Sequence, residues 1–116
     1  MADVHVAAIC GSLRDESYTR IALQRALDGA EAAGASTELL DLREWELPVY
    51  DADEDEAGDA ERFRERVRGA DSVLLGSPMY HGSYSAALKN ALDYCGFDEF
   101  EHKTVGLLGV AGGSFP

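Results

Sequence analysis

Residues 4–20 read VHVAAICGSLRDESYTR, an apolar run that passes through a single glycine into a polar segment. The Val, Ile and Ala residues of positions 3–10 are typical of a strand that is buried on both faces. Ser17 is a natural N-cap, and the apolar residues that follow it recur at helical spacing as far as Gly34, which fits a C-cap. The segment therefore predicts a strand, a short turn and a helix, and the N-terminus of such a helix can bind an anion.

The same alternation of strand and helix patterns continues to the end of the chain. Apolar or alternating runs predict further strands at 37–42, 72–77 and 104–110. Helical spacing of apolar residues predicts helices at 59–68 and 85–95. The order β-α-β-α-β-α-β indicates one α/β domain with a parallel sheet and helices on both of its faces.

The charge balance of the chain argues against two classes of binding partner. The chain has 22 acidic against 10 basic side chains, which gives a net charge of −12. Nucleic acids and anionic membranes bind basic surfaces, so we expect neither as a partner. The excess of acid favours a halophilic protein, because about 1 M salt screens charge repulsion beyond about 3 Å. Charge that serves only to keep the protein in solution is the alternative.

The sequence carries no pattern of a membrane helix, a disulfide or a metal site. No apolar stretch approaches the roughly 18 residues of a membrane-spanning helix. Cys10 and Cys95 form neither a CxxC pair nor a zinc-binding spacing, so we expect reduced thiols and a cytoplasmic location. The acidic stretch 51–59 lacks the glycine and glutamate positions of an EF-hand and is interpreted as a solvated loop.

Three loops should lie on one rim of the predicted sheet. Parallel sheets bind ligands at the carboxyl ends of their strands, near the point where the strand order reverses. The segments that follow the first, third and fourth strands are residues 11–17, 77–84 and 111–115. A binding site is expected where these loops meet.

The first of these loops has the chemistry of a site for a single phosphate. It contains neither a Walker GxxxxGK[ST] motif nor the GxGxxG dinucleotide fingerprint. Hydroxyls from Ser12, Ser17 and Thr19, a forked donor from Arg14 and the free N–H groups of the helix would suit a terminal phosphate. The alternative is that Ser17 only caps the helix and Arg14 is solvated.

The second and third loops have features that suit a planar ring. Tyr80, His81 and Tyr84 gather aromatic side chains around Gly82, which permits a tight turn or close approach of a ligand. The third loop carries adjacent glycines, which would also allow a close approach. A plain tight turn remains an alternative for the glycines, and a histidine with a purely local role remains one for His81.

The motifs GSLRxxSxxR, LPVYDAD, SPMYHGSYSAALKNALDY and GG follow the four predicted strands in this order. Together they resemble the NADPH-dependent FMN reductase family of flavodoxin-like proteins. The resemblance covers nearly the whole chain. It implies a flavodoxin-like, doubly wound parallel sheet in three α/β/α layers, and one FMN-binding domain over residues 1–116. It also implies FMN and NADPH as cofactors.

The resemblance further implies which residues bind the flavin. The first loop would hold its phosphate, and the second and third loops would border its isoalloxazine ring. The implied cofactor-binding residues are Ser12, Arg14, Ser17, Tyr18, Thr19, Pro78, Met79, Tyr80, His81, Gly82, Gly112 and Gly113. No catalytic side chain is assigned, because hydride transfer to a flavin requires no protein acid or base.

The function implied is an FMN-dependent NAD(P)H oxidoreductase that passes hydride from nicotinamide to flavin and then to a small-molecule acceptor. The acceptor would be a quinone, an azo compound, a metal ion or a free flavin. A flavodoxin-type electron carrier that does not use NAD(P)H directly is the alternative. The family also suggests a homodimer or homotetramer, and a further helix, a fifth strand and a last helix after the GG loop. Without that strand, the fourth strand would be an open apolar edge.

Overall fold

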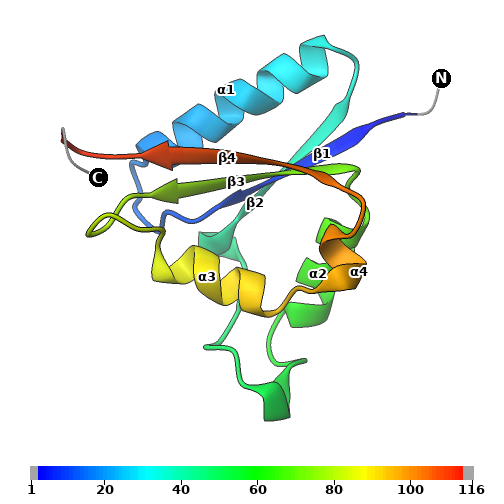
Figure 1. Ribbon diagram of the computed structural model, residues 1–116, viewed down its shortest axis with the longest axis vertical. Helices are drawn as coiled ribbons and strands as arrows, with labels where there is room; N and C mark the ends of the chain where they lie inside the picture. Colours follow the sequence, from blue (N-terminus) through cyan, green and yellow to red (C-terminus); the bar gives the residue numbers. More distant parts are fainter. Residues whose placement is uncertain (1–2, 114–116) are drawn as a thin grey trace.

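The computed structural model of the chain describes residues 3–113 (Figure 1). In chain order its strands and α-helices are β1 (His5–Cys10), α1 (Tyr18–Ala32), β2 (Ser36–Asp41), α2 (Ala60–Arg68), β3 (Ser72–Pro78), α3 (Ala86–Asp93), α4 (Phe97–Phe100) and β4 (Thr104–Val110). Short 3-10 helices at Leu42–Glu44 and Ala52–Glu54 lie between β2 and α2. The predicted alternation of strands and helices is confirmed.

The four strands of the described sheet are all parallel and lie in the order β2-β1-β3-β4. Ile9 of β1 stands between Leu40 of β2 and Leu75 of β3, which fixes the register at the centre of the sheet. The chain runs from β1 outward to β2 and then returns to the other side of β1 for β3 and β4. The strand order therefore reverses between β1 and β3, where a parallel sheet offers a crevice for ligands.

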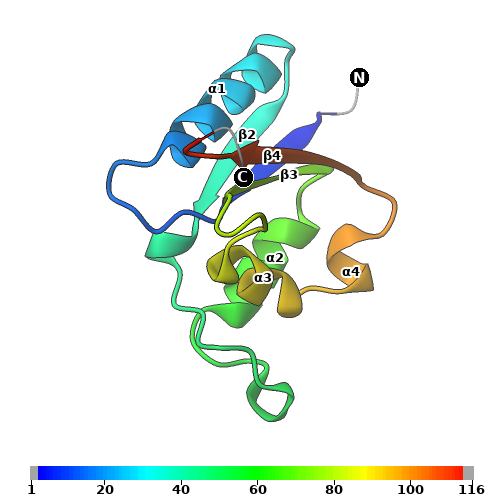
Figure 2. The ribbon, with the colours of Figure 1, turned by 60° about the vertical axis from the view of Figure 1, so that its left-hand side comes forward.

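The helices form two layers, one on each face of the sheet. Helix α1 covers one face, and α2, α3 and α4 lie on the other (Figures 1 and 2). Strand β1 is buried from both sides: Ala7 and Ile9 face the core beneath α2 and α3, whereas Ala8 and Cys10 face α1. The predicted α/β/α architecture is therefore confirmed, and the flavodoxin-like fold with it.

Several boundaries differ from those predicted. Strand β1 begins at His5 rather than at residue 3, and α3 ends at Asp93 rather than at residue 95. Helix α4 was not predicted, because its four residues are too few for a helical period. Helix α1 ends at Ala32, and its C-cap is Ala33 rather than the predicted Gly34. Gly34 follows as a left-handed glycine with a φ of 102°.

Two further features bear on the predictions. Trp45, beside the end of β2, packs edge-on against buried Phe63 with ring centroids 5.6 Å apart. Strand β4 is an edge of the described sheet, and Leu107 on it is 81% exposed.

Among the helices within residues 3–113, none is both long enough and apolar enough to cross a bilayer.

Candidate functional site

The three loops predicted to share one rim meet around a single cleft. The cleft has a volume of about 460 Å³ and lies at the carboxyl ends of β1, β3 and β4. We call it the rim cleft, and its lining residues are Ser12, Arg14, Ser17, Tyr18, Thr19, Pro78, Met79, Tyr80, Val110, Ala111 and Gly112. Its size lies within the range of small-molecule sites.

The first loop (residues 11–17) is fixed at its start by contacts with the end of β3 and the start of α3. The Gly11 N–H donates to the carbonyl of Gly76 at 2.8 Å, and the Ser85 hydroxyl donates to the carbonyl of Gly11 at 2.7 Å. A Cβ at position 11 would lie 2.9 Å from the Cβ of Leu88, so only glycine fits there. The loop therefore starts from a defined position beside the second loop.

The start of α1 presents free donors to the rim cleft. The Ser17 hydroxyl oxygen accepts the Arg20 N–H at 3.1 Å, so its own proton is left to donate to a ligand. No acidic side chain lies in the first turn of this 15-residue helix. Ser12 and Thr19 lie on either side of the cap and are almost fully buried. The positive end of the helix dipole and these hydroxyls together suit an anion.

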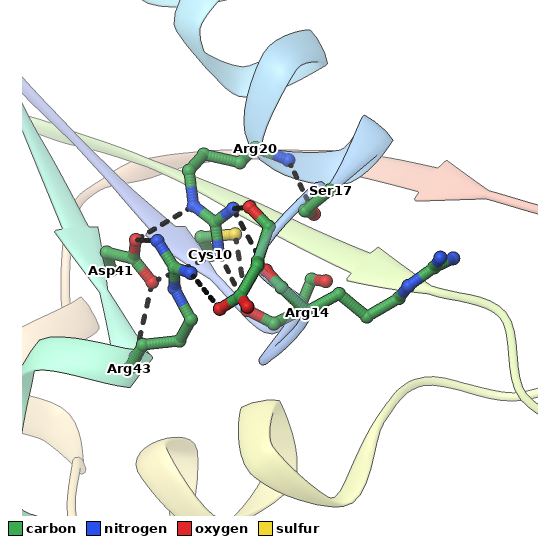
Figure 3. A network of polar contacts seen from close by, with 8 residues as sticks. Cys10, Arg14, Ser17, Arg20, Asp41 and Arg43 are labelled. Carbon is green, nitrogen blue, oxygen red and sulfur yellow. Dashed lines mark hydrogen bonds and ion pairs between the residues drawn. The ribbon is translucent and has the colours of Figure 1, made fainter.

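Arg20 lies behind the first loop and binds it from the protein side (Figure 3). Its Nε donates to Asp41 Oδ2 at 2.8 Å, and its Nη2 is 3.5 Å from Asp41 Oδ1. The same guanidinium donates to three loop carbonyls: Nη2 to Ser12 at 3.2 Å, and Nη1 to Arg14 at 3.1 Å and Asp15 at 3.2 Å. The side chain of Arg14 extends away from this network.

Asp41, at the end of β2, joins Arg20 to Arg43. Arg43 reaches Asp41 Oδ2 at 3.3 Å and Asp15 Oδ1 at 3.2 Å, so it also holds the far side of the loop. Burial raises the pKa of Asp41, but hydrogen bonds from Arg20 and Arg43 outweigh it, and the pKa lies below its ordinary value. Asp41 is therefore a carboxylate at neutral pH.

The second loop (residues 77–84) contains a tight turn with positive φ angles at its two central residues. His81 has a φ of 52° and Gly82 a φ of 77°, and Tyr80 and Ser83 exchange both backbone hydrogen bonds, at 3.0 and 3.1 Å. These values fit a type I′ turn. The Met79 N–H donates to the carbonyl of Val110 at 2.8 Å, which links this loop to the start of the third loop. Of that loop, predicted at residues 111–115, positions 114 and 115 lie outside the described residues. Tyr80 remains about half exposed at the rim.

All of the sequence-predicted site residues line the rim cleft except His81, Gly82 and Gly113. Gly82 borders a neighbouring cleft of about 520 Å³ between α3 and strands β3 and β4, whose lining is mostly apolar. Arg20 and Asp41 were missed as parts of the site. Arg20 is the final arginine of the motif GSLRxxSxxR, but its partner Asp41 lies 21 positions later, at the end of β2.

A family model described as NADPH-dependent FMN reductase matches residues 4–116. The chain belongs to this family. The match begins just before β1 and includes every residue that lines the rim cleft.

Relatives in the family agree with this assignment. The chain is 39% identical to an NAD(P)H-dependent FMN reductase of Pseudomonas aeruginosa over 97% of its own length and 63% of the relative's. It is also 39% identical to an NADPH azoreductase of a Bacillus species, over 93% of the chain and 59% of the relative. The chain thus spans about three fifths of the length of these curated relatives.

Solved structures share the fold. The flavoenzyme NAD(P)H:(acceptor) oxidoreductase FerB of Paracoccus denitrificans has a TM-score of 0.77 and 27% identity, over 96% of this chain and 63% of that one. The apo form of an NADH:FMN oxidoreductase has a TM-score of 0.80 at 21% identity, over 96% of this chain and 60% of that one. At the lower identity the likeness supports the flavodoxin-like fold alone.

Proposed function

We propose that the chain forms the flavin-binding part of an FMN-dependent NAD(P)H oxidoreductase. The observation that carries the proposal is the rim cleft, in which hydroxyls, a helix N-terminus and Arg14 meet the second and third loops. The names of the family and its relatives support the same function. In this proposal, FMN supplies the electron chemistry when bound, because its ring accepts hydride from reduced nicotinamide.

The first loop fits the phosphate end of FMN. Ser12, Ser17 and Thr19 offer hydroxyl protons. Ser17 caps the Arg20 N–H, and within the described residues the N–H groups of Tyr18 and Thr19, the first two of α1, donate to no protein acceptor. The Arg14 side chain is exposed and points away from the acidic partners of the Arg20 network, so it can pair with a phosphate. Serine and threonine hydroxyls with one arginine suit a monophosphate better than a pyrophosphate, which other folds approach with bare glycines.

The second and third loops fit the ring end. Pro78, Met79 and Tyr80 give an apolar border on one side of the rim cleft, and Ala111 and Gly112 give a small-residue border next to them. The hydrogen bond from Met79 to Val110 keeps the two borders together. His81 and Gly113, which do not line the cleft, are proposed to contact only the edge of a ring that extends beyond it.

The electron acceptor is proposed to be a small oxidised molecule such as a quinone or an azo compound. Two relatives, 39% and 37% identical to this chain, are named as azoreductases, which supports an azo compound; a quinone is proposed as a second flat acceptor that takes up the same two electrons. Tyr80 and Tyr84, which are 49% and 54% exposed, offer aromatic surface on which a flat acceptor or nicotinamide could stack. No side chain is assigned as a proton donor.

Stopped-flow mixing tests the proposal. The chain is loaded with FMN and mixed anaerobically with NADPH, and the flavin absorbance band is followed. Rapid bleaching is expected; bound flavin that bleaches only on addition of a reduced protein donor would instead indicate a flavodoxin-type carrier, which the acidic surface would also suit.

A matched pair of variants tests the assignment of the phosphate end. Arg14→Gln should weaken FMN binding about tenfold, because it removes a charge-assisted hydrogen bond. Arg25→Gln removes the same charge from an exposed position on α1 outside the cleft and should leave the dissociation constant unchanged. Equal effects of the two variants would contradict the assignment.

A further inference from the structure

We propose that Arg20 and Asp41 are positioning residues, which hold the first loop so that its backbone N–H groups meet the phosphate of the flavin. The inference rests on the proposed function and adds to it the source of phosphate selectivity. The pair does not contact the ligand in this scheme. It acts through the loop that the guanidinium binds from behind (Figure 3).

The first step in the argument is that Arg20 has no donor left for a phosphate. A guanidinium carries five N–H groups in a fixed planar fork. Nε uses its one N–H on Asp41, and each of the two terminal nitrogens makes two contacts: Nη1 with the carbonyls of Arg14 and Asp15, and Nη2 with that of Ser12 and with Asp41. The arginine of the loop that remains free for a ligand is Arg14.

The second step concerns the peptide groups whose carbonyls Arg20 holds. In a trans peptide the carbonyl of one residue and the N–H of the next point in opposite directions. The N–H groups of Leu13, Asp15 and Glu16 are therefore turned away from Arg20. Within residues 3–113, none of the hydrogen bonds uses these three N–H groups as donors. Two of them, on Asp15 and Glu16, are adjacent and lie directly before the start of α1. Adjacent unpaired N–H groups of this kind can form an anion-binding concavity.

The third step is that the network supplies geometry and adds no net charge. Two arginines, Arg20 and Arg43, are paired with two carboxylates, Asp41 and Asp15. Asp41 is only 4% exposed and comes from β2, so a rigid strand fixes the plane of the guanidinium. Electrostatics alone would favour anion binding after removal of Asp41, because a negative charge near the phosphate would be lost. If the pair instead acts by positioning the loop, removal of Asp41 should weaken anion binding.

Flavin titrations separate these two possibilities. Asp41→Asn and Arg20→Lys are compared with the unmodified chain by fluorescence titration with FMN and with riboflavin, which lacks the phosphate. We expect both variants to weaken FMN binding about tenfold or more, and to change riboflavin binding less than about twofold. Tighter or unchanged FMN binding, or an equal loss for both flavins, would overturn the proposal.

The control is Glu38→Gln, which also neutralises a carboxylate of β2 that pairs with an arginine, in this case Arg66. Its FMN affinity should equal that of the unmodified chain. Urea unfolding of each variant shows that it is folded at the temperature of the titration. Arg20→Lys keeps the positive charge but lacks the fork, so its loss of FMN affinity separates geometry from charge.

A second measurement keeps the inference separate from the proposed function. Amide chemical shifts of Leu13, Asp15 and Glu16 are followed by NMR during titration with inorganic phosphate. Saturable shifts in the unmodified chain that are lost in Asp41→Asn support positioning; equal responses in both proteins, or none in either, overturn it. A chain that binds neither flavin contradicts the proposed function, and the phosphate titration then still decides the role of the pair.

Discussion

The hydroxyl of Ser85 donates to the carbonyl of Gly11 at 2.7 Å and so joins two loops that are 74 positions apart in sequence. The same residue receives more contacts: its N–H donates to the Ser77 hydroxyl at 2.8 Å, and its Oγ accepts the N–H of Leu88 at 3.1 Å to cap α3. One buried serine thus holds the first loop, the second loop and the start of a helix together.

Replacement of Ser85 by alanine should lower the free energy of unfolding by about 1–3 kcal/mol, because it removes a cap and leaves a buried carbonyl without its donor. Urea unfolding followed by circular dichroism measures this loss. Ser83→Ala, in the exposed turn, is the control and should change the stability by less than about 0.5 kcal/mol. Similar values for the two variants would show that the Ser85 hydroxyl does not hold the loops.

A side chain does not fit at position 11, whereas position 29 has space for one. The Gly11 position is blocked by the Leu88 Cβ and the Ser85 Oγ, each at 2.9 Å, but no atom lies within 4 Å of a Cβ on Gly29 in α1. We expect Gly11→Ala to destabilise the chain by about 1–3 kcal/mol and Gly29→Ala to stabilise it by about 0.5–1 kcal/mol. Thermal unfolding of both variants measures the two changes in stability. Changes in the same direction would contradict the packing described.

Cys95 should be slow to alkylate in the folded chain. Burial, with a further contribution from Glu99, raises the pKa of its thiol to about 12. Burial also raises the pKa of Cys10. Since the thiolate is the reactive species, iodoacetamide at pH 8 should label both cysteines far more slowly than in urea-unfolded chain. Mass spectrometry of the time course measures this; equal rates in the two states would contradict it.

The contribution of Asp41 to stability should vanish in acid. Its pKa is lowered in the folded chain, so the contribution is present above the unfolded value of about 3.9 and is lost as the pH falls through the folded pKa. Asp41→Asn should therefore cost about 1–3 kcal/mol at pH 7 and progressively less below about pH 4. Urea unfolding at a series of pH values checks this, and a constant difference down to pH 3 would contradict it.

Salt should assist the use of NADPH. The chain carries a net charge of −12, and NADPH is itself a polyanion, so the two repel each other at low ionic strength. We expect kcat/KM for NADPH to rise as sodium chloride increases from about 0.1 M to about 1 M, where the Debye length falls from about 10 to about 3 Å. A flat or falling profile in a folded sample would contradict adaptation to high salt.

Local patterns were sufficient to predict the alternation of strands and helices and the parallel sheet, whereas the flavodoxin-like arrangement was implied by the family resemblance. The apolar run of β1 and the helical spacing after Ser17 are decided by neighbours within a few residues, and both elements are present with boundaries within two residues of those predicted. The same holds for β4, which was predicted at residues 104–110 and lies there. Helix α4 was missed because four residues carry no period, and its cap depends on the Glu99 side chain bound to the Gly96 N–H.

The site was only partly predictable, because some of its contacts join distant positions. Ser12, Arg14 and Ser17 share one short motif and could be placed together. The interaction of Arg20 with Asp41 could not be inferred, since it depends on the register of β2 beside β1. Asn90 was similarly missed: its side chain binds the backbone of Leu47, Pro48 and Tyr50 and so fixes the loop before α2.

A crystal of the chain soaked with FMN tests the central claim most directly. We expect the phosphate to lie at the start of α1, within hydrogen-bond distance of Ser12, Ser17 and Arg14, with the ring between the second and third loops. An intact sheet whose rim cleft stays empty in excess FMN, or holds the flavin with its phosphate turned to solvent, would contradict the account.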